Sequence, residues 1–142
     1  MVPIGGKRNG EHFPSWRRKG QKQEAEDHVT IEVSRLDSPE SAALVRLAGF
    51  LQRRAAASLL DAFKDLSEND VSKIVVDMAD VQYTNSSAIG AFVNMASAVK
   101  ASGGKMVLFA MPANIRKIFN TLGLTGLFET APTREEAIEM IS

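Results

Sequence analysis

The side chains of this chain that could do chemistry lie in a polar run, Thr-Asn-Ser-Ser, at residues 84–87. The run follows an apolar segment, 73–78, and precedes residues that recur at helical spacing from Ile89 onward. Asn, Ser and Thr favour helix starts because their side-chain oxygens accept hydrogen bonds from unpaired N–H groups of the first turn. Loops at the carboxyl ends of strands are also where α/β domains meet ligands and partners. The run therefore predicts a helix start and the main functional loop.

The hydroxyl of Ser86 has two interpretations. As a helix cap it would contribute about 1 kcal/mol to stability. As a phosphorylation site it would gain roughly −1.5 to −2 charges, which a helix start tolerates, so modification would change docking without unfolding the domain. Chemistry alone favours the cap.

No pattern in the chain indicates an enzyme. His12 and His28 lie in or beside the N-terminal segment, away from any nucleophile and strand-end acid. The chain has no cysteine, which excludes disulfides, cysteine metal sites and cysteine nucleophiles. It has neither a P-loop nor a dinucleotide fingerprint. Asp77 and Asp80 flank the polar run, but aspartates at strand ends usually face solvent. We expect no catalytic residues, no metal site and no cofactor.

The predicted elements that position the polar run are those of an α/β domain. An initial hairpin is followed by strict alternation of helices and strands, which predicts a mixed, mostly parallel sheet of about five strands packed with about four helices. The predicted strands are 29–33, 43–48, 74–78, 105–110 and 127–130, with Gly49 ending the second. The predicted helices are 53–66, the segment from Ile89 to Ala101, the segment from Pro112 to Leu122 and the segment after Thr133.

The N-terminal segment differs from the rest of the chain. Residues 1–27 are poor in apolar side chains, which predicts a disordered extension. Basic and acidic residues balance at 17 each, but residues 1–22 hold six basic residues against Glu11 alone, so a basic extension precedes an acidic domain. Residues 13–19 read Phe-Pro-Ser-Trp-Arg-Arg-Lys, and this aromatic and basic patch could meet nucleic acid or an anionic surface. A solvated tail is the simpler interpretation, and we expect no direct nucleic-acid binding.

The distribution of apolar residues indicates where in the cell the protein would be found. No apolar run approaches the roughly 18–20 residues that a membrane span needs. The basic N-terminus has no apolar stretch behind it, as a secretory signal would. We therefore expect a soluble, cytoplasmic protein without a membrane span.

Four motifs resemble the STAS family (sulphate transporter and anti-sigma factor antagonist). Residues 85–90 read Asn-Ser-Ser-Ala-Ile-Gly, where the family has Asp-Ser-Ser/Thr-Gly-Leu-Gly opening a helix. Gly-Phe-Leu-Gln at 49–52 is similar to the family's Gly-Glu-Leu-Asp after the second strand. Gly-Gly-Lys at 103–105 and Leu-Gly-Leu at 122–124 also match. The pieces occur in the family's order, and the resemblance implies one STAS domain over residues 28–142.

Similarity to bacterial anti-sigma factor antagonists implies partner switching in transcription regulation. The unmodified protein would bind an anti-sigma factor, often a serine kinase, and free the sigma factor. The kinase would phosphorylate a serine, the complex would dissociate, and a PP2C-type phosphatase would reset it. Residue by residue, that serine falls on Ser86, with Ser87 as the second candidate. A new dianion in a partly desolvated interface costs several kcal/mol unless it is paired.

Two acids of the family pattern are neutral here, namely Asn85 before the serine and Gln52 after the second strand. Both replacements keep hydrogen-bonding capacity and remove charge. They motivate an alternative, an unswitched STAS subunit of a stressosome-like or lipid-transport ABC complex. Nucleotide or small-ligand binding at the same loop is a third hypothesis, against which the missing phosphate-cradling glycine loop argues. A homodimer is left open.

The expected docking surface includes one face of the helix after the polar run. Helical spacing places Ala88, Ala91, Met95 and Ala98 opposite the core stripe, where small side chains and a flexible Met would let a partner approach. A helix packed on both sides within its own domain is the alternative. The predicted partner-binding residues are Gln52, Thr84, Asn85, Ser86, Ser87, Ala88, Ala91 and Met95.

Overall fold

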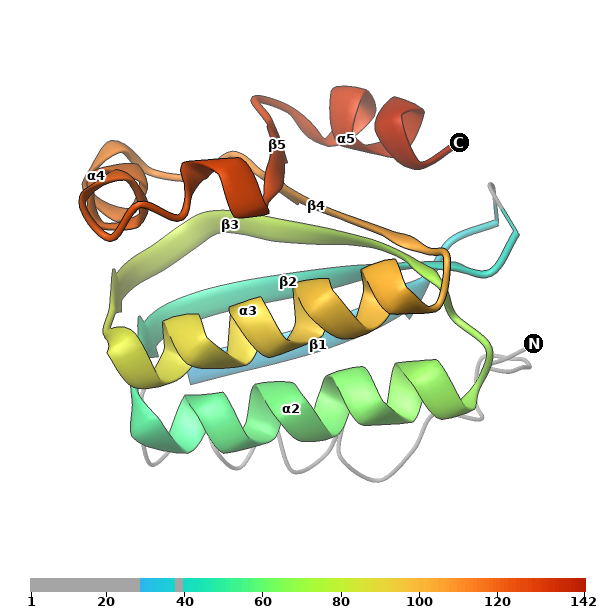
Figure 1. The fold of residues 1–142 in the computed structure, drawn as a ribbon, viewed down its shortest axis with the longest axis horizontal. Coiled ribbons are helices and arrows are strands. Elements are labelled where there is room, and N and C mark those ends of the chain that lie inside the picture. The colour runs from blue at the N-terminus through green and yellow to red at the C-terminus, as the bar shows by residue number, and fades with distance from the viewer. Residues whose placement is uncertain (1–28, 38–39) are drawn as a thin grey trace.

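The computed structural model describes residues 29–37 and 40–142 as one sheet with helices on both faces (Figure 1). Its strands are β1 (Val29–Arg35), β2 (Ala42–Leu51), β3 (Lys73–Thr84), β4 (Lys105–Phe109) and β5 (Glu129–Ala131). Its helices are α2 (Arg53–Glu68), α3 (Ser86–Ala101), α4 (Ala113–Thr121) and α5 (Arg134–Ile141), with a 3₁₀ turn, η1 (Thr125–Leu127). The predicted disordered extension, 1–27, lies outside the described residues.

The five strands follow the chain across the sheet, in the order β1-β2-β3-β4-β5. β1 pairs antiparallel with β2, and every other neighbouring pair is parallel. The predicted mixed, mostly parallel sheet is therefore confirmed. Figure 1 shows α2 and α3 together on one face and α5 on the other.

Two groups of buried side chains hold the layers together. The larger core lies between the sheet and the α2–α3 layer and includes the fully buried rings of Phe63 and Phe92. α4 adds Phe119 to this core, with its ring centroid 6.3 Å from that of Phe92. The smaller core lies under α5, where Ile141 packs with Val107 and other strand residues.

β3 continues to Thr84, well past its predicted end. The register between β2 and β3 shifts between Arg46 and Ala48 and again between Gly49 and Phe50. At each shift β3 holds one residue more than β2, which is the pattern of a β-bulge. The bulges break the two-residue alternation by which a strand is recognised, so the sequence pattern indicated a loop where the strand persists.

The other strand and helix boundaries differ less from the predicted ones. β2 continues through Gly49, its predicted end, to Leu51, because Gly49 adopts a φ of +98° within the strand. The fifth strand lies slightly later than predicted, since residues 125–127 form the 3₁₀ turn. Thr133 caps α5 as expected, and its hydroxyl accepts a hydrogen bond from the N–H of Glu136. No helix in the described part of the chain is long and apolar enough to cross a bilayer.

Candidate functional site

The candidate site is the edge of the sheet where β2 and β3 end. Leu51 and Thr84 are opposite each other in the sheet register. Gln52 and Asn85 come next and stand at the N-cap positions of α2 and α3. Residues from two separate motifs of the sequence therefore meet at one edge, between the starts of two adjacent helices.

Asn85 is the residue that caps α3. Its side-chain Oδ1 accepts a hydrogen bond from the backbone N–H of Ala88 at 3.3 Å. Ser86 and Ser87 are the first two residues of the helix, and both are exposed. Ser86 is thus not the N-cap residue, and its hydroxyl lies on the surface in the first helical turn.

The expected exposure of the docking face of α3 is wrong. Ala88, Ala91 and Met95 are buried, with 0%, 2% and 6% of their surface accessible. α3 packs against α2 as well as against the sheet, and these three side chains belong to the larger core. Among the four residues of that face, Ala98 alone is exposed. The alternative of a helix packed on both sides is confirmed.

Thr84 also lies inside the domain. Its accessible surface is 2%, and its Oγ1 has no hydrogen-bond partner among the described residues. It therefore offers no surface to a partner. Of the predicted partner-binding residues, the ones with exposed side chains are Gln52, Ser86 and Ser87, and Asn85 is half-buried.

The structure adds two residues that the sequence analysis missed. Phe50 and Tyr83 stand opposite each other on β2 and β3, with ring centroids 6.2 Å apart. They are 40% and 44% exposed, unusual for large aromatic side chains. Tyr83 lies three positions before Ser86, and Phe50 two before Gln52. The sequence carried a signal for them, because each aromatic residue lies within three positions of a predicted partner-binding residue.

The starts of α2 and α3 at this edge hold neutral and basic side chains. The first turns of α2 and α3 contain no acidic residue. The first residue of α2 is Arg53, whose side chain is exposed. Both helix starts add partial positive charge from their unpaired N–H groups.

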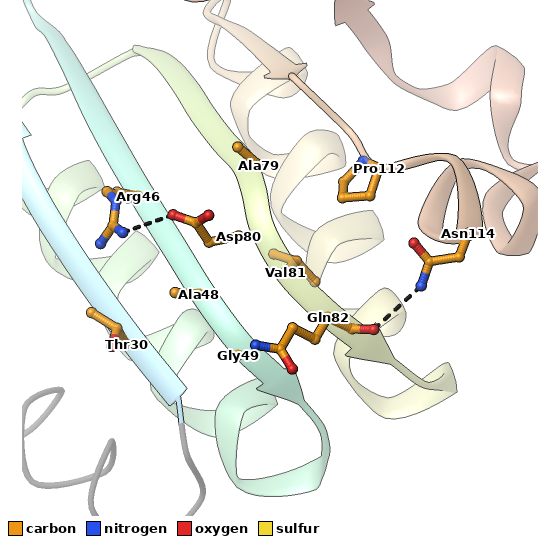
Figure 2. Close-up of a pocket in the computed structure, with 10 residues that line it drawn as sticks. All are labelled: Thr30, Arg46, Ala48, Gly49, Ala79, Asp80, Val81, Gln82, Pro112 and Asn114. Carbon is orange, nitrogen blue, oxygen red and sulfur yellow. Dashed lines mark hydrogen bonds and ion pairs between the residues drawn. The ribbon is translucent and has the colours of Figure 1, made fainter.

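A hollow of about 740 Å³ opens on the face of the sheet that is turned away from α2 and α3 (Figure 2). Its lining residues are Thr30, Arg46, Ala48, Gly49, Ala79, Asp80, Val81, Gln82, Pro112 and Asn114. Arg46 Nη2 lies 2.8 Å from Asp80 Oδ2, and Arg46 Nη1 lies 3.4 Å from Glu32 Oε1.

The two aspartates beside the polar run, Asp77 and Asp80, make separate contacts in the structure. Asp80 is paired with Arg46, and the carboxylate of Asp77 accepts the N–H of Ala79 at 3.0 Å. Each carboxylate thus has a structural partner of its own. The described residues contain no cluster of three His, Cys, Asp or Glu side chains that could hold a metal ion.

A family model described as the STAS domain matches residues 1–137. A crystal structure of a candidate anti-sigma factor antagonist from Thermotoga maritima superposes with a TM-score of 0.71 at 19% identity, covering 78% of this chain and 93% of that chain. The phosphorylated form of SpoIIAA from Bacillus gives a TM-score of 0.63 at 21% identity, over 80% and 100%.

A larger protein shares the fold as well. The murine solute carrier 26 family member A9, an anion transporter, gives a TM-score of 0.59 at 12% identity. The match covers 80% of this chain but 22% of the transporter. At these identities the structural likeness shows a common fold, which occurs both as a separate protein and as a part of a larger one.

Proposed function

Because this chain belongs to the STAS domain family, we propose that it is a cytoplasmic anti-sigma factor antagonist, switched by phosphorylation of Ser86. The observation that carries the proposal is the position of this serine. Its side chain is exposed in the first turn of α3, and the capping role belongs to Asn85. A kinase can therefore reach Ser86, and its modification removes no hydrogen bond that caps the helix.

The proposed switch is electrostatic. A phosphoryl group on Ser86 brings roughly −1.5 to −2 charges to the start of α3, where the helix dipole tolerates them. In a bound complex the same dianion would lie in a partly desolvated interface, and without a matching cation this costs several kcal/mol. Phosphorylation thus ends binding and leaves the domain folded. SpoIIAA, which shares this fold, exists in a phosphorylated form.

The partner in this proposal is an anti-sigma factor with serine kinase activity, and a PP2C-type phosphatase reverses the modification. The chain itself is a binding module and not an enzyme. Its docking surface consists of Gln52, Ser86, Ser87 and the exposed rings of Phe50 and Tyr83. Paired aromatic rings with a polar surround are typical of the residues that carry most of the binding energy in protein interfaces.

The first experiment is intact mass and site mapping on the protein purified from its own host. The proposal expects one phosphoryl group, which is lost in Ser86→Ala and kept in Ser87→Ala. Transfer of the phosphoryl group to Ser87 would contradict the assignment of Ser86. Complete absence of modification under all growth conditions would contradict the switch.

The second experiment measures affinity for the anti-sigma factor recovered from that host. Ser86→Glu should weaken binding by at least about tenfold, the equivalent of 1.4 kcal/mol. Ser87→Glu is the matched control, with the same charge change one residue further along α3, and should weaken binding less. Equal affinity of Ser86→Glu and the wild type would refute the electrostatic switch.

A second candidate function rests on the neutral residues Asn85 and Gln52, which stand where the family pattern has acids. These replacements favour a STAS subunit that binds permanently in a larger complex, stressosome-like or of the lipid-transport ABC type. Such a subunit would co-purify at a fixed stoichiometry without any kinase. Purification as a lone protein would exclude it.

A further inference from the structure

We propose that residues 1–28 dock on their own domain, on the face of the sheet that carries the hollow of Figure 2. The aromatic and basic run 13–19 would lie between the acidic side chains of this face and the ring pair Phe50–Tyr83. This inference goes beyond the proposed function. It concerns a contact within one chain, and its test does not depend on an anti-sigma factor.

The face is open in the part of the chain that the structure describes. Side chains of β2 alternate, so Val45 and Leu47 point into the larger core while Arg46 and Ala48 line the hollow on the other side. The alternation places Phe50 on the hollow side too. α5 contacts β3, β4 and β5, and the smaller core lies beneath it.

The charges of the face and of the segment are complementary. At the hollow, the carboxylates of Glu32 and Asp80 share the one guanidinium of Arg46, which leaves an excess negative charge. Both carboxylates are more than half exposed. The part of the segment that contains the run 13–19, residues 1–22, holds six Lys and Arg side chains against a single Glu, and the acidic Glu24, Glu26 and Asp27 follow it closer to β1. A basic segment gains from such a surface, more so when the contact excludes water.

The point of attachment favours this face over other surfaces. Val29 pairs with Gly49, and Thr30, the next residue, lines the hollow. The segment therefore enters the domain at the edge of the proposed docking face. Trp16 lies 13 positions before Val29, a distance of at most roughly 45 Å when extended, so it can reach the whole face. A tether this short gives an effective concentration on the order of millimolar.

The rings provide the apolar part of the contact. Phe50 and Tyr83 leave much of their surface accessible, and Phe13 and Trp16 are the aromatic residues of the segment. Offset or edge-to-face contacts between such rings contribute about 0.5–1.5 kcal/mol beyond their buried area. Arg17 and Arg18 can also stack on an exposed ring face.

Trp16 provides the test, because it is the one tryptophan in the sequence. Its emission spectrum and its quenching by acrylamide report on this segment alone. In the full chain we expect emission at shorter wavelength and about twofold less quenching than in a synthetic peptide of residues 1–28, because a docked ring loses much of its accessible surface. An identical spectrum and identical quenching in chain and peptide would overturn the proposal.

Two charge reversals locate the contact. Glu32→Lys, on the docking face, should return the Trp16 emission and quenching to the peptide values. Glu68→Lys makes the same charge change at the exposed end of α2, on the opposite side of the sheet, and should leave both unchanged. Circular dichroism checks that both variants fold. If Glu32→Lys leaves Trp16 protected, or if Glu68→Lys exposes it, the segment docks elsewhere and the proposal is wrong.

Dilution distinguishes a contact within one chain from one between chains. The protected state of Trp16 should persist from high to low protein concentration, because the segment is tethered. Loss of protection on dilution would show that a second copy supplies the segment, and would overturn the contact in cis. Protection that appears after nucleic acid is added, and not before, would also overturn it.

Discussion

Asn85 and Ser86 are adjacent polar residues with different structural roles. Either type can cap a helix, so the polar run predicted a helix start without deciding which residue stands at the N-cap. The decision follows from where β3 ends. Because the strand persists to Thr84, Asn85 takes the cap and Ser86 is carried onto the exposed first turn. The sequence pattern placed Ser86 at the boundary between loop and helix, where the structure has it. The exposure of its side chain was not predictable, because it depends on the end of β3 at Thr84, and the β-bulges hide that end in the sequence pattern.

The cap predicts a measurable difference between two substitutions of Asn85. Asn85→Ala removes the acceptor of the Ala88 N–H and should lower the free energy of unfolding by about 1 kcal/mol. Asn85→Asp keeps an acceptor and adds a favourable charge at the helix start, so its stability should equal or exceed that of the wild type. Urea denaturation followed by circular dichroism compares them. Equal stability of the Ala variant and the wild type would show that the cap contributes nothing.

Gly104 should tolerate no side chain. A Cβ at this position would overlap the carbonyl oxygen of Ser72, which also accepts the N–H of Lys105 at 2.9 Å. Gly104→Ala must displace backbone and should lower the free energy of unfolding by about 2 kcal/mol or more. Gly90→Ala is the control, because a Cβ added at Gly90 would meet nothing within 4 Å and Ala favours a helix interior. The control should be neutral or more stable, and a Gly104→Ala protein as stable as this control would contradict the structure.

At the scale of elements, helix α3 shows which contacts of the site could be predicted from the sequence. The apolar stripe of α3 correctly indicated its contact with the sheet. The opposite face, made of Ala and Met, fits both a partner surface and a helix–helix contact, because small side chains allow close approach in either case. A helix that is apolar on most sides is usually buried. Here α2 provides the second layer, which no local pattern in α3 could reveal.

The last helix, α5, contributes more to stability than its position at the end of the chain suggests. Chain ends usually tolerate substitution, yet Ile141 is 1% exposed and completes the core under α5. Ile141→Ala should therefore lower the free energy of unfolding by about 2–4 kcal/mol. Glu139→Ala, on the exposed side of the same helix, should change it by less than about 0.5 kcal/mol. Chemical denaturation measures both, and similar values would mean that α5 does not hold the smaller core.

At the scale of the whole molecule, the proposed switch must act without unfolding. Ser86→Glu places charge on the exposed first turn of α3 and should change the melting temperature by no more than about 3 °C. Ala91→Glu, on the same helix, buries a carboxylate in the larger core and should unfold the domain or lower its melting temperature by more than about 10 °C. Thermal denaturation compares the two. A Ser86→Glu protein that melts as early as Ala91→Glu would mean that modification acts by unfolding.

The sheet as a whole was predictable because alternating strands and helices leave few topologies. The predicted hairpin of the first two strands and the parallel order of the rest are both found in the structure. The open face beside Arg46 was not predictable, since it depends on how far α5 reaches across the sheet. The pairing of Phe50 with Tyr83 was not predictable either, because two bulges set their register.

The antiparallel pairing of β1 has a practical consequence for tagging this protein. Val29 lies opposite Gly49, so the N-terminal segment joins the domain near the edge that carries Ser86, and a fusion partner ahead of it is tethered to that edge. The other end of the chain leads away from that edge. The carbonyl of Met140 accepts the Lys105 amino group at the first residue of β4, where the parallel strands begin. A fluorescent protein or affinity handle therefore belongs after Ser142, where it leaves the docking edge clear for a binding assay.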